Sequence, residues 1–425
     1  MFRSEGIAAI ILNGGKGTRS MDTSTPKCLK LVGNRTILEI QLTELFDAGV
    51  SKAYISLGYH AELVSDWLSH WDNPGLELMI VFDADTIGTA NAVFQVSKVA
   101  AEQNFIIVPG DLFLNLDISS LLLSFISSGK DVAIYSHPNS HPSDSDLLFE
   151  DFDGSLIFLP KTRNPNLNFR NNALSGLVAT SKKFLKKIKP IAGSFESQLI
   201  EISISQKSLA LIPIFGIVMD TGTPARLKRA NEIFHSKSLS RIVGKVPVVL
   251  MDLDDTILRD TGVNRYSSPV FYPDALEFIE KLNHLAIPII ILTNQPSIAK
   301  GEISDLDFHE FIKKCEMLLS AQGLHWDSFY FCPHHPHAGF QNEVLDYKIV
   351  CSCRKPATGL FDKLKADTSE ELQPILMIGD SGRDWELSMN LAIPFAHIQR
   401  NENCRLDCSH DCYKTLAEVE INARY

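Results

Sequence analysis

Residues 248 to 256 read V-V-L-M-D-L-D-D-T, and this stretch decides the fold of the C-terminal half of the chain. Its apolar, mostly branched run is typical of a buried central strand in a parallel sheet. The run ends on Asp252, Asp254 and Asp255. Carboxylates at positions i and i+2 of a strand point to the same side, so Asp252 and Asp254 can converge on one cation just past the strand. A strand followed by an acidic turn gives the same letters, so the rest of the chain has to decide.

The size and composition of the chain limit its class. At 425 residues it is too long for one ordinary core, which predicts two domains. Its 45% apolar and 21% charged residues are typical of a soluble globular protein. The net charge of -11 argues against a nucleic-acid partner, and no apolar run reaches the length needed for a membrane partner. The N-terminal residues leave no room for a signal peptide, so we expect a cytoplasmic location.

Short apolar strands alternate with helical stretches in both halves, which predicts an α/β fold with helices on both faces of each sheet. The expected strands are residues 7–12, 53–57, 76–82, 105–108, 132–136, 209–213, 248–252, 287–292, 329–332, 375–378 and 395–398. Amphipathic segments at 36–48 and 89–101 are expected helices. The polar, basic residues 236–246 are the predicted linker between domains at 1–235 and 247–425.

A glycine-rich turn follows the first expected strand and reads N-G-G-K-G-T-R, residues 13 to 19. Gly14, Gly15 and Gly17 allow backbone N–H groups to approach phosphate oxygens, and Arg19 and Lys27 add positive charge. The turn has neither the ending of a P-loop nor the spacing of a dinucleotide fingerprint. On its own, a glycine-rich turn of this kind is more often structural than a phosphate site.

The segment L-N-G-G-K-G-T-R…P-K-C-L resembles the signature loop of the sugar-phosphate nucleotidyltransferases. Further matches follow in order: I-G-T-A at 87 to 90, V-P-G-D at 108 to 111, N-N-A-L-S-G-L at 171 to 177 and M-D-T-G-T-P at 219 to 224. The resemblance covers nearly all of residues 7 to 235. It implies a Rossmann-like, GT-A-like mixed sheet and transfer of a nucleotidyl group to a sugar 1-phosphate.

The same resemblance implies roles for individual residues. Asp111 and Asp220 would hold Mg²⁺ against the nucleotide phosphates, because charge builds on the bridging and leaving oxygens during the transfer. Arg19 and Lys27 would bind the leaving pyrophosphate. The other implied substrate-binding residues are Gly14, Gly15, Gly17, Thr89, Lys161 and Gly176. Two features depart from the family: the gap from Arg19 to Lys27 is short, and Pro160 precedes Lys161 where a glutamate is usual. A domain that has lost its activity is therefore the alternative.

Three further motifs accompany D-L-D-D-T, namely L-T-N-Q at 292 to 295, R-K-P at 354 to 356 and I-G-D-S at 378 to 381. Together the four motifs resemble those of the haloacid dehalogenase-type phosphohydrolases. The resemblance implies that Asp252 is the nucleophile and that Asp254 is the general acid and base. The implied phosphoryl- and substrate-binding residues are Thr293, Asn294, Gln295, Arg354 and Lys355. The implied Mg²⁺ ligands are Asp252, Asp254, Asp380 and the backbone carbonyl of Leu253.

Most of the eight cysteines lie between positions 332 and 412, which indicates metal binding rather than disulfide crosslinks. Cys332 and His334 form one close pair, and Cys351 and Cys353 form another, so these four residues predict a structural zinc site. His335 and His337 are possible substitutes for His334, although exposed histidines are the simpler interpretation. Cys404, Cys408 and Cys412 share one helix spacing but have no evident fourth ligand, so we expect them to be reduced cysteines.

The combination C-P-H-H-P…C-x-C-R-K-P resembles the D-glycero-D-manno-heptose 1,7-bisphosphate 7-phosphatases and the neighbouring histidinol phosphatases. Only about 38 residues separate Asp254 from Thr293, which leaves no room for a cap domain. Asp255 stands where that family usually has glycine. Asp260 is a weak candidate for substrate contact, because R-D-T-G-V-N at 259 to 264 matches the family's substrate loop only loosely.

The two halves together predict a bifunctional enzyme that dephosphorylates heptose 1,7-bisphosphate at C7 and transfers a nucleotidyl group, GMP from GTP, to heptose 1-phosphate. Its partners would be small-molecule substrates only, and its cofactors Mg²⁺ at both sites and a structural Zn²⁺. The first alternative is the same pair of reactions with another sugar and a uridylyl, cytidylyl or adenylyl group. The second is a phosphatase fused to an inactive binding module. The sequence leaves open whether the chain forms a homo-oligomer.

Overall fold

The computed structural model describes residues 6–14, 24–83, 88–163, 167–235, 245–400 and 411–421. The chain divides into two compact units, each of which contains two segments. The first unit combines Met1–Ser136 with Leu174–Leu239, and the second combines His137–Ala173 with Ser240–Tyr425. Residues 137–173 therefore group with the C-terminal half of the chain. The domain boundaries inferred from the sequence stay a prediction, and most of the predicted linker lies outside the described residues.

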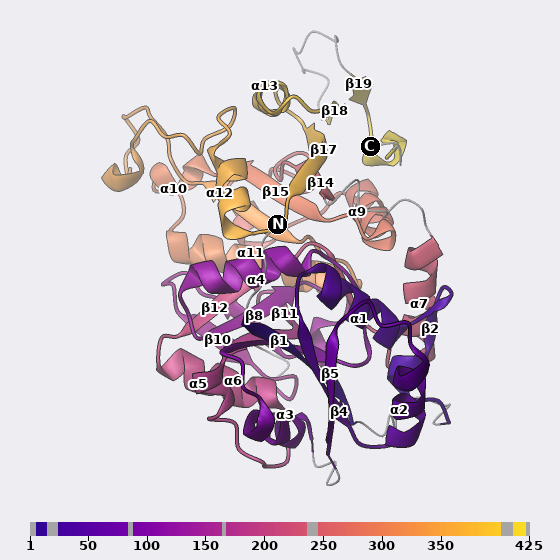
Figure 1. Ribbon diagram of the computed structural model, residues 1–425. Coiled ribbons are helices and arrows are strands. Elements are labelled where there is room, and N and C mark those ends of the chain that lie inside the picture. Colours follow the sequence, from indigo (N-terminus) through magenta and orange to yellow (C-terminus); the bar gives the residue numbers. More distant parts are fainter. Residues whose placement is uncertain are drawn as a thin grey trace. The chain divides into compact units, whose positions relative to one another are not determined.

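The sheet of the first unit is built around β1 (Ile7–Asn13), which pairs in parallel with β4 (Lys52–Leu57) and β6 (Asn104–Pro109) (Figure 1). Strand β5 (Glu77–Phe82) extends the sheet in parallel beyond β4, and β11 (Ala173–Ser181) is antiparallel to β6. The sheet is therefore mixed, as predicted. Strands β4 and β6 lie on opposite sides of β1, so the strand order reverses between β1 and β6. Open α/β sheets bind ligands at such a reversal.

Smaller strands complete the first unit. Strand β12 (Leu209–Pro213) pairs in parallel with β8 (Val132–His137), and β13 (Ile217–Asp220) pairs antiparallel with β7 (Leu112–Asn115). Strands β2 and β3 form a small antiparallel pair at Leu31–Val32 and Arg35–Thr36. The helices are α1 (Ile37–Asp47), α2 (Ala61–His70), α3 (Thr89–Val99), α4 (Ile118–Ser128), α5 (Lys182–Leu185), α6 (Phe195–Ser205) and α7 (Pro224–His235).

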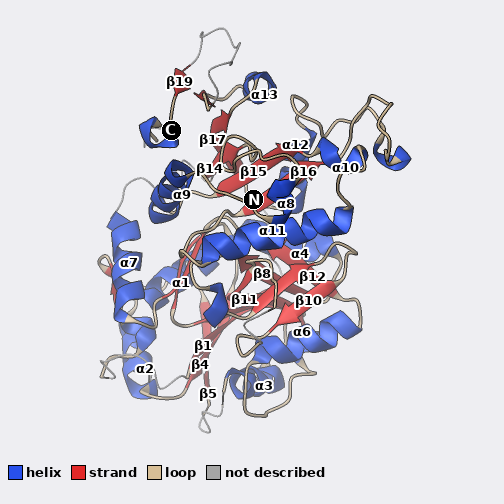
Figure 2. Cartoon of the chain, turned by 180° about the vertical axis from the view of Figure 1, so that it is seen from behind, coloured by secondary structure: helices blue, strands red, loops and turns tan. Residues whose placement is uncertain are grey.

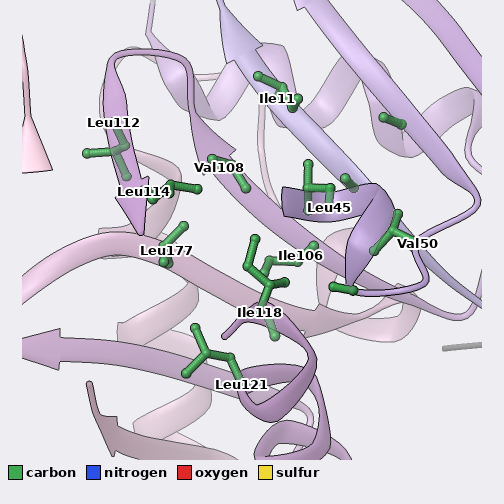
Figure 3. Packing of buried hydrophobic residues seen from close by; sticks show 14 of the residues in the cluster. Ile11, Leu45, Val50, Ile106, Val108, Leu112, Leu114, Ile118, Leu121 and Leu177 are labelled. Atoms are coloured by element: carbon green, nitrogen blue, oxygen red, sulfur yellow. The ribbon is translucent and has the colours of Figure 1, made fainter. Parts of the chain in front are cut away.

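The core of the first unit packs helices against the central strands. Ile11 of β1, Ile106 and Val108 of β6 and Leu45 of α1 are buried in one cluster (Figure 3). Helix α1 begins where the Thr36 hydroxyl accepts a hydrogen bond from the N–H of Glu39 (3.1 Å), which satisfies a backbone donor that has no partner within the helix. Burial on both faces explains why β1 is a continuous apolar run rather than an alternating one.

The second unit contains a fully parallel sheet in the order β16-β15-β14-β17-β18-β19. The first strand of this unit along the C-terminal segment, β14, lies inside the sheet, and the strand order reverses between β14 and β17. The strands are β14 (Val246–Met251), β15 (Ile289–Asn294), β16 (Ser328–Cys332), β17 (Leu372–Gly379), β18 (Phe395–Ile398) and β19 (Asp411–Tyr413). Ligands of such sheets bind beyond the carboxyl ends of the strands at the reversal.

Helices separate the strands of this sheet along the chain (blue and red in Figure 2). They are α8 (Asn264–Ser267), α9 (Pro273–Leu285), α10 (Pro296–Ala299), α11 (Asp305–Ser320), α12 (Gly359–Asp367) and α13 (Gly382–Leu391). Only α8 and α9 lie between β14 and β15, so this part of the chain has no cap domain, as predicted. The same unit holds the hairpin of β9 (Leu147–Glu150) and β10 (Leu156–Leu159), and β9 pairs with the first residue of β11.

The predicted α/β class, with a mixed N-terminal sheet and a capless Rossmann-like C-terminal sheet, is confirmed. Every expected strand is present, and no end differs from its predicted position by more than three residues. Strands β7 and β13, with four residues each, and the nine-residue β11 were not expected from the sequence. Among the described residues, no helix is both long and apolar enough to span a membrane.

Candidate active sites

The first candidate site lies at the strand-order reversal of the second unit. Asp252 follows β14, and its backbone N–H donates to the carbonyl of Ile378 in β17 (2.9 Å). Asp380 follows β17, so the two aspartates leave neighbouring parallel strands at the same edge. Carboxylate oxygens of Asp252, Asp380 and Asp384 all lie within 4.8 Å of one another. Three carboxylates at this distance are the oxygen ligands that a hard divalent cation such as Mg²⁺ requires.

The sequence analysis missed Asp384, which is fully buried in the first turn of α13. The Ser381 hydroxyl (2.5 Å) and backbone N–H (3.2 Å) donate to its Oδ2, which completes a capping box at the start of the helix. The opposite oxygen, Oδ1, accepts a hydrogen bond from Lys355 (2.5 Å). A signal was available, because a serine three residues before an acidic residue at a helix start is the capping-box pattern.

Lys355 is the cation of this site. Its Nζ lies 2.6 Å from Oδ1 of Asp252 and 2.5 Å from Oδ1 of Asp384, and the residue is 3% exposed. Asn294 fixes the backbone of Lys355 on both sides: its Nδ2 donates to the Lys355 carbonyl (3.1 Å), and its Oδ1 accepts from the Lys355 N–H (2.9 Å). Burial opposes the charge on Lys355, but the two carboxylates outweigh burial and raise its pKa.

The carboxylates themselves are under electrostatic strain. Burial raises the pKa of Asp252, and the neighbouring Asp384 and Asp254 raise it further against the opposing effect of Lys355. Burial also raises the pKa of Asp380, and the charges of Asp252 and Asp384 add to that effect. A divalent cation among these oxygens would remove the repulsion and keep the carboxylates ionised. The donor set and its electrostatics therefore fit Mg²⁺.

Asp254 lies beside the carboxylate group and is linked to the strand that carries Thr293. The Nε2 group of Gln295 donates both to Oδ2 of Asp254 (2.8 Å) and to the hydroxyl of Thr293 (3.0 Å). Arg265, a buried residue that the sequence analysis did not single out, places Nε 3.0 Å from Oδ1 of Asp254. Burial raises the pKa of Asp254, and Arg265 partly offsets the rise. A carboxyl group with a raised pKa can donate a proton, as a general acid must.

Three neighbouring predictions have different outcomes. The carbonyl oxygen of Leu253 accepts hydrogen bonds from the N–H groups of Ile257 and Leu258 (2.9 Å each), so it serves the turn, and no observation supports it as a metal ligand. Asp255 has a φ of 51°, in the left-handed region that favours glycine. Asp260 accepts from Nη1 of Arg265 (2.7 Å), so it contacts the residue that contacts Asp254.

The predicted zinc ligands come together. The ligand atoms of Cys332, His334, Cys351 and Cys353 lie within 4.8 Å of one another. The contacts between sulfur atoms span 3.3 to 3.6 Å, and Nδ1 of His334 lies 3.1 Å from Sγ of Cys353. These separations are slightly shorter than the edges of about 3.7 Å that Zn–S bonds impose on a tetrahedron. The set of three thiols and one imidazole fits a closed zinc site.

The remaining candidates around the zinc ligands are not part of that cluster. His335 points Nδ1 at the carbonyl of His337 (3.2 Å), and neither residue belongs to the group of four. Nη1 of Arg354 donates to the carbonyl of His334 (3.2 Å), which ties Arg354 and Lys355, the predicted substrate-binding pair, to the segment that carries His334. Cys412 lies 3.5 Å from Nδ1 of His397. Cys404 and Cys408, which share its four-residue spacing in the sequence, lie outside the described residues.

The second candidate site lies in the first unit, where Lys27, Asp111 and Asp220 converge on Gly222. Nζ of Lys27 forms an ion pair with Oδ2 of Asp111 (2.8 Å). The N–H of Gly222 donates to Oδ1 of Asp220 (2.6 Å). A Cβ atom at Gly222 would lie 2.8 Å from Asp220, 3.1 Å from Lys27 and 3.5 Å from Asp111, so only glycine leaves room for the three side chains. The structure thus brings together three residues that the sequence analysis placed at one site.

Short strands hold the two aspartates in this position. Asp111 directly precedes β7 and Asp220 ends β13, and these strands are paired antiparallel with Asp220 opposite Leu112. The N–H (2.9 Å) and hydroxyl (2.7 Å) of Thr221 both donate to the Asp111 carbonyl. Arg226, which the sequence analysis missed, donates from Nη1 to Asp220. Asp111 and Asp220 thus each have a basic partner, Lys27 and Arg226. These four charged groups fit a site in which the carboxylates would bind a metal ion and the basic groups the phosphates of a nucleotide.

The other candidates of this site are less fully constrained. Gly14 follows β1, and a Cβ there would lie 3.7 Å from the carboxylate of buried Asp83, which accepts a hydrogen bond from Asn91 (2.6 Å). The sequence analysis missed Asp83 and Asn91. Thr89 begins α3, and its hydroxyl accepts from the N–H of Phe195 (3.2 Å). Gly15, Gly17 and Arg19 lie outside the described residues.

Lys161 and Gly176 occupy different segments. Lys161 is exposed in the second unit, and its backbone N–H donates to Oδ1 of Asp146 (2.7 Å). Gly176 lies in β11 with a φ of 85°, and a Cβ there would approach Pro109 to 3.1 Å. A side chain at position 176 would therefore be strained by its backbone and crowded by its neighbour. Their assignment to a sugar-phosphate site stays a prediction.

Comparisons with known proteins match the two halves of the chain to two different families. Residues 8–144 match the family described as Nucleotidyl transferase, and residues 247–401 match the family described as Polynucleotide kinase 3 phosphatase. The chain is 30% identical over 149 residues to a protein of Thermoplasma volcanium that is named "Probable D-glycero-D-manno-heptose-1,7-bisphosphate 7-phosphatase", covering 35% of this chain and 94% of that protein. The chain belongs to this phosphatase family.

Two further matches support the two halves of the bifunctional chain. The D-glycero-beta-D-manno-heptose-1,7-bisphosphate 7-phosphatase of Escherichia coli O6:H1 is 28% identical over 142 residues, 33% of this chain and 73% of that protein. A crystal structure assigned as a glucose-1-phosphate thymidylyltransferase from Bacillus anthracis shares 19% identity with a TM-score of 0.50, covering 54% of this chain and 96% of that one. The second match shows the nucleotidyltransferase fold alone. The heptose bisphosphate phosphatase-like chain thus also carries a nucleotidyltransferase domain.

Proposed function

We propose that this protein removes the C7 phosphate from heptose 1,7-bisphosphate and transfers a nucleotidyl group to the resulting heptose 1-phosphate. The observation that carries the proposal is the position of Lys355. It follows the zinc ligand Cys353 by two residues and places its ammonium 2.6 Å from Asp252. Lys355 thus links Asp252, the proposed nucleophile, to the loop that the proposed zinc ion would hold through Cys353. The chain that contains this arrangement is a member of the heptose bisphosphate phosphatase family.

In the phosphatase reaction, a carboxylate oxygen of Asp252 attacks phosphorus, and the bond from phosphorus to the sugar oxygen breaks. Asp254 gives its proton to the departing sugar oxygen and then accepts a proton from water, which attacks the aspartyl-phosphate and releases phosphate. Lys355 offsets the charge on the phosphoryl oxygens. Mg²⁺, when held by Asp252, Asp380 and Asp384, supplies further charge stabilisation.

In the transferase reaction, a phosphate oxygen of the sugar 1-phosphate attacks the α-phosphorus of a nucleoside triphosphate, and pyrophosphate leaves. Asp111 and Asp220 would hold Mg²⁺ against the triphosphate, and Lys27, 2.8 Å from Asp111, would pass to the leaving pyrophosphate. The nucleotide is GTP in this proposal, which rests on the resemblance of the N-terminal half to manno-heptose 1-phosphate guanylyltransferases. Arg19 and Lys161 have their proposed roles from the same resemblance.

The two reactions are chemically consecutive. Removal of the C7 phosphate leaves a sugar with a free 1-phosphate, which is the nucleophile that a nucleotidyltransferase requires. Fusion of two domains in one chain does not by itself establish that they act on consecutive substrates, because sites rather than folds define function. The sites therefore have to be tested separately.

The decisive experiment supplies purified full-length chain with sugar 1-phosphates and nucleoside triphosphates in pairwise combination and measures pyrophosphate release. Heptose 1-phosphate with GTP should give the highest kcat/KM. In parallel, release of inorganic phosphate from heptose 1,7-bisphosphate is measured with and without Mg²⁺. Preference for another sugar or base would replace the substrate assignment, and phosphate release without any pyrophosphate release would identify the N-terminal half as an inactive binding module.

A further inference from the structure

Helix α11 of the second unit carries two charged residues that are buried. Lys313 is 8% exposed and Glu316 is 4% exposed, although both belong to the side-chain types that rarely become buried without partners. Both residues bind the segment formed by residues 137–163 and 167–173, which we call the strap. The strap belongs to the second unit but is contributed by the N-terminal half of the sequence.

Glu316 binds the end of the strap. Nε of Arg170 donates to both carboxylate oxygens (2.8 and 2.9 Å), and Nη2 of Arg170 also lies 2.8 Å from Oε1. The backbone N–H of Asn171 donates to Oε2 (2.8 Å). Nε1 of Trp326 donates to Oε1 (3.1 Å). A forked arginine contact to a buried carboxylate fixes both the distance and the orientation of the two segments.

A second group of contacts holds the hairpin of the strap. Nζ of Lys313 lies 3.0 Å from Oδ1 of Asp151, directly after β9, and 2.8 Å from Oε1 of Glu310. Nδ2 of Asn168 donates to Oε2 of Glu310 (3.0 Å). Met317 of α11 packs against the apolar cluster of the strap, which consists of Leu147, Phe149, Phe169 and Ala173.

The strap carries residues that the proposed function assigns to the sugar phosphate. Lys161 lies in it, and Asn171 lies two residues before the start of β11, the strand that holds Gly176. Asn171 is itself doubly bound to the start of the strap: its Oδ1 accepts from the N–H of Asn139 (3.1 Å), and its Nδ2 donates to the Asn139 carbonyl (2.8 Å). The Glu316 contact therefore fixes the segment that enters β11.

We propose that Glu316, a residue of the phosphatase half, is a positioning residue for sugar 1-phosphate binding in the transferase reaction. The inference rests on the proposed transferase function. Glu316 acts through Arg170 and Asn171, which set where the Lys161-bearing strap ends and β11 begins. It touches no reacting atom. Loss of its charge leaves Arg170 without a carboxylate and frees the strap end, while the phosphatase carboxylates keep their contacts.

The test compares Glu316→Gln and, on the other side of the contact, Arg170→Met with a control, Glu280→Gln. Glu280 is exposed on α9, where none of the described residues forms an ion pair with it. Both strap variants should raise KM for the sugar 1-phosphate roughly tenfold or more while KM for the nucleotide and phosphatase kcat/KM stay at the level of the unchanged chain. Backbone amides of residues 167–173 should exchange hydrogen faster in both variants, and the control should match the unchanged chain.

Each other outcome overturns the inference in a different way. An unchanged KM for sugar 1-phosphate in both variants would show that the strap contact does not position the substrate. Equal loss of both activities in Glu316→Gln would indicate damage to α11, and Arg170→Met, which leaves α11 intact, would then decide. If the unchanged chain releases no pyrophosphate with any sugar 1-phosphate, the proposed transferase function fails and this inference fails with it, so the two failures are distinguishable.

Discussion

The ammonium group of Lys355 lies 2.6 Å from the carboxylate of Asp252, although 103 residues separate them in the sequence. Both residues are buried, and the same ammonium reaches Asp384 at 2.5 Å. An ion pair of this kind is costly to form and more costly to break, because removal of one member leaves an uncompensated buried charge. The pair therefore belongs to a site that depends on its charge balance, and substitutions should separate chemical from structural effects.

Asp252→Asn should reduce phosphate release from the sugar bisphosphate by roughly four orders of magnitude or more, because an amide is a poor nucleophile. The amide keeps the shape of the side chain, so the fold should survive. Pyrophosphate release by the same preparation serves as the control and should be unchanged. Substantial phosphate release by this variant would show that another group attacks phosphorus.

Asp384→Asn should weaken Mg²⁺ binding rather than abolish the chemistry. The variant loses one of three carboxylates within 4.8 Å, so the Mg²⁺ concentration for half-maximal phosphatase activity should rise roughly tenfold to a hundredfold. Asp380→Asn should behave in the same way. A Mg²⁺ titration of phosphate release measures the effect, and an unchanged midpoint in both variants would remove these residues from the metal site.

The sequence predicted the parts of the sites that lie in short motifs at strand ends. Asp252, Thr293 and Asp380 could be found because buried strands and polar strand ends are local signals. Lys355 lies in the loop before α12 and was found through its R-K-P motif. Asp384 and Arg265 were missed because their role comes from packing of a helix start and a turn against those motifs. The contact between Arg170 and Glu316 spans 146 residues, and no local pattern reports such a separation.

Asp111→Ala and Asp220→Ala should each remove pyrophosphate release by at least about a hundredfold, because the triphosphate would lose its metal contacts. In Asp111→Ala, Lys27 also loses its 2.8 Å partner and can bind anions without a metal. Phosphate release from the bisphosphate should remain within about twofold of the unchanged chain, because its carboxylates lie in the other unit. Parallel loss of both activities would indicate misfolding and undercut the assignment of two independent sites.

Acid should destabilise the second unit through His325. Burial, together with the charges of the nearby His137 and His141 of the strap, lowers the pKa of His325 to about 3. Because the folded pKa lies below the unfolded value, the unfolded chain binds the extra proton first, and stability is lost as pH falls from about 6.5 toward 3. Asp327 acts in the opposite direction, because burial raises its pKa to about 7.

His325→Gln isolates the histidine from this opposing group. Urea unfolding of the unchanged chain and the variant at several pH values gives the difference in their free energies of unfolding. The difference should be constant above about pH 6.5 and should then shift in favour of the variant by about 1 kcal/mol per pH unit as pH falls. Parallel pH profiles would show that His325 takes up a proton in the folded chain as readily as in the unfolded one.

Zinc should be structural, because four protein ligands leave no open coordination position. The purified chain should contain about one zinc ion, and Cys353→Ser should lower that content. Phosphate release should fall with it, since Lys355 follows Cys353 by two residues and Arg354 bonds to the His334 carbonyl at 3.2 Å. Pyrophosphate release should be nearly unchanged, and Mg²⁺ alone should not restore the lost activity.

Cys315→Ser, at a buried cysteine outside the ligand group, is the control, and this variant should contain as much zinc as the unchanged chain. Elemental analysis that finds no zinc in chelator-free protein would leave the four residues as a cluster of reduced side chains.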